Sequence, residues 1–380
     1  MITVTSCSPN SDLAGIWNEF VARASPNVFM SPAALRAAQN TMFAAIHVLC
    51  AWDAGIDSQK LVGLWALQER QIFPLWPSFL EALPFEYAFL SSPVIDPAYS
   101  NEVMAAFFTA IRTNRQLPNV VSLKQLDGEA PSYKAMQKVI ADGGHRVLRL
   151  SESLRPVASP ETGVKKSGST RKKLRQDWNR LAALGVVDIV NVRDAKLAVQ
   201  DFETFLALEM QSWKGAEGTA LLCSERDSRF VREMFAGLAA HGNASVAMLR
   251  LDGRAIAAQV VLYCGKTAYT WKTAFDAEFA KFSPGALLID KVTEDLFTAG
   301  GIEAIDSCSA EGGFMSNLWT GRRTMVDMLV DAGPQWSASF AMEAGRQIGR
   351  ERLRHLRDRV RGLSWLHPGR KTARLAAPHS

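Results

Sequence analysis

The chain has 380 residues, of which 48% are hydrophobic and 21% charged, so it belongs among ordinary globular proteins of two or three domains. This composition excludes disorder or a coiled coil for the chain as a whole. The net charge of +5 is uneven: residues 1–164 carry 12 basic and 14 acidic side chains, residues 165–333 carry 21 of each, and residues 334–380 carry 10 and 3. A second basic cluster lies at 165–180, where seven basic residues face Asp177 alone.

The first half predicts alternating helices and strands. Apolar spacing predicts a helix over 12–23, and Ser31-Pro32 begins a second one. Two apolar runs, 45–52 and 61–68, predict a hairpin. Further strands are expected at 87–90, 120–123 and 146–150, and further helices at 101–113 and 132–141. Residues 151–169 are polar and contain prolines and glycines, which indicates a domain boundary.

The second half repeats this order. A basic amphipathic helix over 170–184 leads to a strand at 186–192 and to helices at 197–211 and 226–240. Three strands follow at 245–251, 255–263 and 267–275, the first two joined by the hairpin turn Asp252-Gly253. A helix from Ser283-Pro284 to 298, a strand at 302–306 and a helix at 315–329 complete the unit. The sequence therefore predicts an α/β (α+β) fold made of two similar units.

The cysteines and the termini indicate where the protein is found. Five scattered cysteines without a C-x-x-C pair favour a reducing compartment over a disulfide framework or a zinc site. The N-terminus lacks the basic and apolar regions of a secretory signal, and no run approaches the ~18–20 apolar residues that cross a bilayer. We expect a cytoplasmic protein without a metal. A peripheral position at the inner membrane surface is the second option for its location.

The segment 267–296 is the most informative part for function. Its strand passes through a short loop to a helix that begins at Ser283-Pro284-Gly285. Free amides and the positive end of the helix dipole make such a junction a natural pyrophosphate site. Every strand-loop-helix unit creates a helix N-terminus, however, so a purely structural role is the alternative.

Several motifs in fixed order resemble the CelD/BcsL-like group of GNAT acyltransferases, relatives of the FemAB-type transferases. The resemblance covers about residues 10–333. It is carried by Arg171-Lys172-Lys173-Leu174-Arg175, Gln211-Ser212-Trp213-Lys214-Gly215, Gly253-Arg254-Ala255-Ile256-Ala257-Ala258-Gln259, Phe275-Asp276, Phe282-Ser283-Pro284-Gly285, Asp306-Ser307-Cys308, Trp319 and Arg322-Arg323.

The resemblance implies two tandem GNAT-like domains, each with a mixed, mostly antiparallel sheet flanked by helices. They would span 1–155 and 170–333, with a linker at 156–169 and a basic helix and tail at 334–380. It also implies direct transfer of an acyl group from acyl-CoA to an amine, and we expect the acyl group to be acetyl. The residues at the pyrophosphate would be Lys281, Phe282, Ser283, Pro284, Gly285 and Ala286. Because Pro284 replaces a glycine and lacks an amide donor, an aminoacyl-tRNA donor stays open.

Direct transfer needs a base for the amine proton. We expect Asp276, Asp306 and Glu311 to converge at the strand ends where the acyl group would lie. Tyr263, Tyr269 and Lys272 are candidates for protonating the leaving thiolate or orienting the acceptor. Asp276 as a helix cap and Tyr269 as a core residue are the structural alternatives.

Four residues are expected to bind the acceptor, a small molecule or a glycan with an amine in polysaccharide or envelope biosynthesis. They are Trp213, Lys214, Gln259 and Lys272. For the first two, a helix stop is an equal alternative; Gln259, polar in an apolar strand, needs a ligand or a backbone partner.

The tail predicts an amphipathic basic helix. One stripe holds Arg350, Arg354, Arg357 and Arg361, and another holds Leu353, Leu356, Val360 and Leu363. Such a helix suits packing on the body, an acidic protein or an anionic membrane. Nucleic acid is expected only as tRNA, under the aminoacyl-tRNA alternative. A non-catalytic scaffold of an exopolysaccharide system, docked by this tail, is the alternative from another class.

Overall fold

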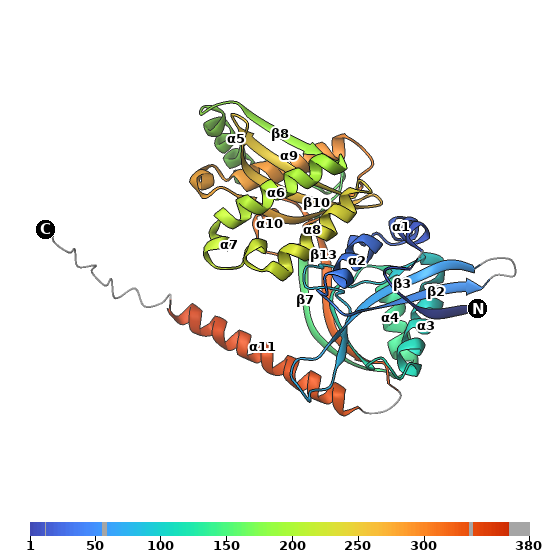
Figure 1. The fold of residues 1–380 in the computed structure, drawn as a ribbon. Coiled ribbons are helices and arrows are strands. Elements are labelled where there is room, and N and C mark those ends of the chain that lie inside the picture. The colour runs from blue at the N-terminus through green and yellow to red at the C-terminus, as the bar shows by residue number, and fades with distance from the viewer. Residues whose placement is uncertain (12, 55–58, 334–336, 365–380) are drawn as a thin grey trace.

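The computed structural model describes residues 1–11, 13–54, 59–333 and 337–364 and places both halves of the chain on one mixed sheet (Figure 1). This thirteen-stranded sheet has the order β1-β2-β3-β4-β6-β13-β7-β12-β11-β10-β9-β8, and β5 pairs with β3. The pairs β4–β6 and β11–β12 are parallel, and the remaining pairs are antiparallel. The mixed, mostly antiparallel α/β fold is confirmed.

The elements of the first half, in chain order, are β1 (Ile2–Cys7), α1 (Ala14–Arg23), η1 (Val28–Met30), α2 (Pro32–Asn40), β2 (Ile46–Ala54), β3 (Gln59–Arg70), β4 (Phe79–Glu81), β5 (Val94–Ile95), η2 (Pro97–Tyr99), α3 (Ser100–Thr113), β6 (Val120–Asp127), α4 (Pro131–Asp142) and β7 (Arg146–Ala158). The predicted hairpin is confirmed, because β2 and β3 pair from Ile46↔Gln68 to Ala54↔Gln59.

The elements of the second half are α5 (Ser169–Ala182), β8 (Val187–Val192), α6 (Ala195–Gln211), α7 (Trp213–Ala216), η3 (Leu221–Cys223), α8 (Glu225–Ala239), β9 (Ala244–Leu251), β10 (Arg254–Cys264), β11 (Thr267–Phe275), η4 (Ala277–Phe282), α9 (Pro284–Thr298), β12 (Ala304–Asp306), α10 (Phe314–Leu318), β13 (Gly321–Asp331) and α11 (Ala338–Ser364). The meander β9–β10–β11 and the helix α9 agree with prediction.

β13 differs most from the prediction. The expected helix over 315–329 is wrong: the helix α10 ends at Leu318, and the chain then forms a strand. β13 lies between β6 and β7, and both neighbours pair with it along most of its length. Its apolar residues, Met325, Val326, Met328, Leu329 and Val330, are all buried. Burial on both faces gives a strand an almost continuous apolar run, which periodicity does not distinguish from a helix.

Two other predicted strands also differ. The strand expected at 87–90 is irregular, and its carbonyls accept hydrogen bonds from side chains: Trp271 Nε1 donates to Tyr87 O at 3.0 Å, and Asn27 Nδ2 donates to Leu90 O at 3.3 Å. β7 is much longer than 146–150, since β13 pairs with it up to Val157↔Gly321. It therefore enters the segment 156–169 expected to be a linker. The division into 1–155 and 170–333 stays a prediction.

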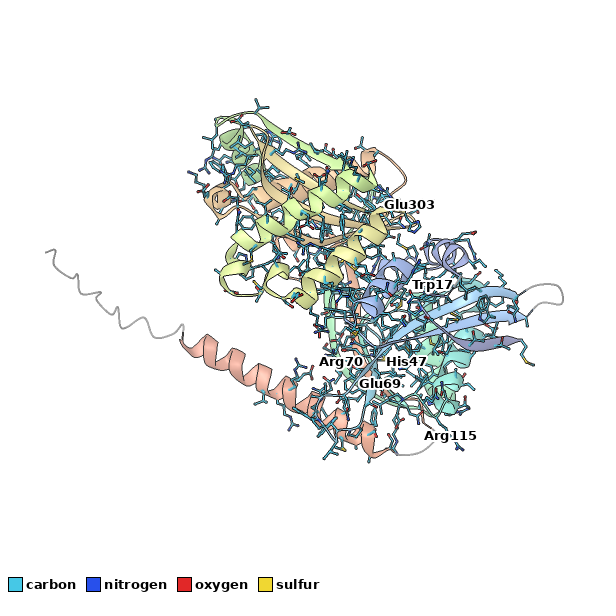
Figure 2. The ribbon with its side chains drawn as sticks, in the orientation of Figure 1. Trp17, His47, Glu69, Arg70, Arg115 and Glu303 are labelled. Atoms are coloured by element: carbon cyan, nitrogen blue, oxygen red, sulfur yellow. The ribbon has the colours of Figure 1, made fainter. Side chains whose placement is uncertain are left out.

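The two halves contact each other through α1, the segment after it and β10–β11. Tyr269 Oη donates to Pro26 O at 2.7 Å, and Cys264 Sγ lies 3.5 Å from Val21 O. Trp17 on α1 is buried and lies on the side of the first half that faces the second (Figure 2). Apolar residues of both halves form one large core, while residues of α5 and α9 belong to a second core in the second half. The halves are thus packed together by a shared core as well as a shared sheet.

α11 is the expected basic helix, and it leads away from the body (Figure 1). Residues 365–380 of the predicted tail lie outside the described part, as do the side chains beyond Leu353. None of the helices in the described ranges is long and apolar enough to span a bilayer.

Candidate functional site

The strands β11 and β12 diverge in the middle of the second half. They pair in parallel only from Thr267↔Ala304 to Tyr269↔Asp306. β11 then continues to Phe275 with β10 on one side, and a bulge leaves Trp271 without a partner in β10. Among the described residues, no strand therefore lies along the other edge of β11 beyond Tyr269. Unpaired backbone groups of such an edge can bind an extended ligand.

Lys214 lies against this free edge. Its Nζ donates to Thr273 O at 3.2 Å and to Glu209 Oε1 at 2.9 Å. Glu209 is fully buried on α6, and its other oxygen accepts from Leu221 N at 3.0 Å. The carboxylate therefore holds the ammonium at the strand edge while it also fixes the loop that follows α7.

Lys272 extends from β11 toward the first half. Its Nζ lies 4.8 Å from the centre of the Tyr87 ring and 5.5 Å from that of Trp271. Burial lowers the pKa of this ammonium, and nearby Glu209 opposes the shift. Within the described residues Lys272 has no ion-pair partner. Tyr87 Oη donates instead to Asp227 Oδ2 at 2.7 Å, so the ring is held in place under the ammonium.

Asp306 ends β12 at the centre of a buried ionic cluster. Arg155 Nη1 lies 3.4 Å from each carboxylate oxygen, Arg323 Nη1 lies 3.0 Å from Oδ2, and Cys308 N donates to Oδ1 at 2.8 Å. The aspartate side chain is completely buried, and Arg155 is 3% exposed. Arg323 also reaches Asp127 of the first half, 3.3 Å away. With its oxygens occupied, Asp306 joins β12, β7, β13 and β6 electrostatically.

The backbone amides at the start of α9 are mostly used within the chain. Pro284 has no N–H, and the amides of Ala286 and Leu287 donate to Ser283 O at 2.9 and 3.1 Å. Ser283 itself adopts a left-handed conformation with a φ of 52°. The amide of Gly285 is therefore the first donor of α9 without a partner among the described residues.

Cations surround this loop. Lys173 Nζ donates to Ser283 Oγ at 2.7 Å. The guanidinium of Arg180 lies 5.3 Å from the ring centre of buried Phe282, and the Lys281 ammonium lies 5.1 Å from it. The buried carboxylate of Asp177 pairs with both Lys173 and Arg180 and offsets part of their charge. The cations at this loop therefore come from side chains rather than from backbone amides.

This part of the chain matches a known domain. Residues 168–313 match a family profile described as "Acetyltransferase (GNAT) domain". Within the second half, residues 168–313 are therefore similar to a GNAT domain. The profile covers less than half of the protein, and it does not extend to β6, β13 or α11.

Solved structures extend the likeness to both halves. FemX is 10% identical over 86% of this chain and 96% of its own, with a TM-score of 0.59. A conserved protein of unknown function from Bacteroides thetaiotaomicron is 10% identical over 87% and 99%, with a TM-score of 0.53. A tandem GNAT protein from the clavulanic acid biosynthesis pathway is 12% identical over 88% and 100%, with a TM-score of 0.46. At these identities the first two show a shared fold and nothing more. No curated protein sequence matches the chain.

The other predicted acid–base residues of the GNAT domain are separated from one another. Asp276 caps η4, accepting from Glu278 N at 3.0 Å, and forms an ion pair with Arg254. Glu311 is half exposed, with Arg322 Nε 3.2 Å away. Tyr269 is buried and bonded to Pro26 O, and burial raises its pKa well above the ordinary value. The expected convergence of carboxylates is not observed: only Tyr269 lies beside Asp306, as its partner in the β11–β12 pairing.

The residues expected at the acceptor form a partial cluster. Lys214 and Lys272 lie together near Glu209, whereas Trp213 is 57% exposed on the surface. Gln259 is fully buried and satisfied internally, since Thr273 Oγ1 donates to its oxygen and its nitrogen donates to Val260 O at 2.7 Å. Backbone and a neighbouring strand thus supply the partners that Gln259 needs.

Three residues of this region were missed by the sequence analysis: Glu209, Tyr87 and Arg155. Glu209 carried a usable signal, because it is a carboxylate among the apolar positions of α6. Tyr87 comes from the other half, and Arg155 meets Asp306 only because β7 lies next to β12. Neither contact follows from local sequence.

Proposed function

We propose that this protein is a GNAT-type N-acyltransferase of the CelD/BcsL-like group. It would move an acyl group, with acetyl as the expected one, from a CoA thioester to an amine. The observation that carries the proposal is the divergence of β11 from β12 inside the matched GNAT domain, with a cationic loop and the start of α9 beyond it. A free strand edge suits an extended amide-containing chain, and the cationic loop suits a pyrophosphate.

In this proposal the amine nitrogen attacks the thioester carbonyl carbon, the carbon–sulfur bond breaks, and the thiolate takes up a proton. We assign Lys272 the role of donating this proton, because a partly buried ammonium whose pKa is lowered by desolvation is a stronger acid than an exposed one. The neutral lysine then accepts the proton that the acylated nitrogen releases, so the residue returns to its starting state. Lys214, fixed by Glu209, would orient the acyl chain along β11.

Asp306 has a positioning role in this proposal. Two arginines and one amide occupy its oxygens, so it is a poor acceptor for the amine proton. The amine acceptor, a small molecule or a glycan of polysaccharide or envelope biosynthesis, would approach from the side of Tyr87, where Lys272 faces the first half.

Calorimetry with acetyl-CoA and longer acyl-CoAs tests the donor. Lys173→Met removes a cation from the Ser283 loop and should weaken binding about tenfold or more, the value of a charge-assisted hydrogen bond. Lys266→Met is the control, since Lys266 is 68% exposed on the β10–β11 turn and paired with Glu303. Loss of acyl transfer in Lys272→Met with unchanged CoA affinity would support the acid role. If no CoA species binds, the CoA proposal is wrong.

One observation favours a second donor, aminoacyl-tRNA, as in FemAB-type enzymes. At the start of α9, which should hold the pyrophosphate, Pro284 lacks a donor and the amides of Ala286 and Leu287 are bonded to Ser283 O, so among the described residues the amide of Gly285 is the first that is left for an anion. Purification at low salt should then retain tRNA, and radiolabelled amino acid should pass from aminoacyl-tRNA to an amine. Transfer from tRNA without any response to CoA would select this alternative. A scaffold without activity would respond to neither.

A further inference from the structure

Among the residues of α11 whose side chains the structure describes, those that pack on the body lie near its beginning. Phe340 and Ala344 pack against a small apolar cluster formed by Phe79, Val120 and Leu329. Glu343 and Gln347 on the same side are 1% and 8% exposed. Beyond Gln347 the helix leaves the body as a rod (Figure 1). At 1.5 Å per residue, the part from Ile348 to Ser364 extends about 25 Å from the last buried contact.

The opposite side of α11 carries an uncovered apolar strip. Met342 is 39% exposed and Leu353 is 68% exposed. They lie about three turns apart, so both project from one side, with Gly345 and Gly349 between them. The sequence continues the same three- and four-residue spacing with Leu356, Val360 and Leu363. Water-exposed leucine on an otherwise polar helix carries a free-energy cost that a partner would remove.

Arginines border this strip on both sides. Arg350 and Arg352 are exposed and lie on opposite flanks of Leu353. Seven residues further on, Arg357 and Arg359 repeat these two positions in the sequence. From Ala338 to Ser364 the chain has seven arginines and three acids, a charge of +4 with histidine neutral. A sequence pattern that sets apolar residues between arginines on both flanks of a helix is typical of helices that lie in a membrane interface.

We propose that α11 docks this protein on an anionic phospholipid bilayer, with the apolar strip in the interface and the arginines at the lipid phosphates. A second copy of the chain fits poorly, because two such helices would set arginine rows against arginine rows. RNA would satisfy the arginines and leave the apolar strip in water. The lipid surface satisfies both. This inference is independent of the proposed acyl transfer, since α11 lies outside the GNAT domain.

Flotation of the full chain with vesicles tests the proposal. The protein should float with vesicles of phosphatidylcholine and phosphatidylglycerol in equal parts, stay with the soluble fraction when phosphatidylglycerol is omitted, and be released by high salt. Arg350→Gln with Arg352→Gln should lower the partition coefficient about 25-fold, because one basic residue near an anionic surface contributes about fivefold. Leu353→Ser should lower it about tenfold, and here the charge is unchanged.

The matched control is Lys196→Gln with Arg229→Gln. Both residues are exposed on helices α6 and α8 of the second half, and the net charge falls by the same amount. This variant should float like the wild type. Equal loss of flotation in both double variants would overturn the proposal, since binding would then depend on total charge. Three other results would also overturn the proposal. They are flotation without anionic lipid, salt-sensitive binding to RNA in place of vesicles, and a lipid-free dimer that Leu353→Ser dissociates.

Discussion

The substitution Asp306→Asn separates the two roles that its position suggests, a catalytic base and the centre of an ionic cluster. The side chain is completely buried, and its charge faces Arg155, 3% exposed, and Arg323, 22% exposed. Removal of one partner from a buried ion pair typically costs about 3–5 kcal/mol, because the remaining charge is left uncompensated. Asparagine keeps an acceptor for Cys308 N, and Arg323 keeps Asp127, so we expect the lower end, about 3 kcal/mol.

Urea denaturation followed by circular dichroism measures this change, with cooperative unfolding as a condition. Glu303→Gln is the matched control: it also lies beside β12, but Glu303 and its partner Lys266 are 67% and 68% exposed, and Figure 2 shows Glu303 at the surface of the second half. An exposed pair contributes less than about 1 kcal/mol. If Asp306→Asn unfolds within about 1 kcal/mol of the wild type yet abolishes acyl transfer, the positioning role is wrong and Asp306 is the base.

Three further changes test other parts of the structure. The Cys50 thiol holds the pKa of Cys7 at about 7, so Cys50→Ala should raise it toward 9.0 and slow iodoacetamide labelling of Cys7 at neutral pH; an unchanged labelling profile would contradict this. Because burial lowers the pKa of Lys272, the charged form of this residue destabilises the folded state. The unfolding free energy of the wild type, compared with that of Lys272→Met, should therefore increase as the pH rises toward 10.5. A difference that stays constant with pH would contradict the lowered pKa. In Gly63→Ala the new methyl would lie 2.3 Å from Val103 Cγ1, which should cost about 1–3 kcal/mol in thermal unfolding, whereas Gly15→Ala, with open space, should cost nothing.

Local signals were sufficient for the hairpins β2–β3 and β9–β10 and for helices such as α2 and α9. Asp252-Gly253 and the alternating residues on either side give the β9–β10 hairpin, and Ser31-Pro32 gives the start of α2. They failed where a strand depends on distant neighbours. β13 is a strand because β6 and β7 lie on either side of it, and the spacing of Met325, Met328 and Leu329 alone suits a helix equally well.

The candidate site divides in the same way. Lys272 and Lys214 were predictable, since a lysine in an apolar strand or after a helix end needs a particular environment. The partners that define their chemistry were not: Tyr87 belongs to the other half, and Glu209 becomes relevant only when α6 packs on β11. Asp306 was identified as unusual, but its arginines come from strands that local sequence cannot bring together.

The position of β13 between β6 and β7 affects how the protein folds during its synthesis on the ribosome. While the nascent chain still lacks residues 321–331, β6 and β7 each have an unpaired edge, although β1 to β7 have already been translated. The first half therefore cannot complete its part of the sheet when it emerges from the ribosome. It does so only after nearly all of the second half has been translated, because β13 comes last. Open edges of this kind attract foreign strands. We expect nascent chains stalled before β13 to bind chaperones, and the two halves to reach their native state together in the last step of synthesis.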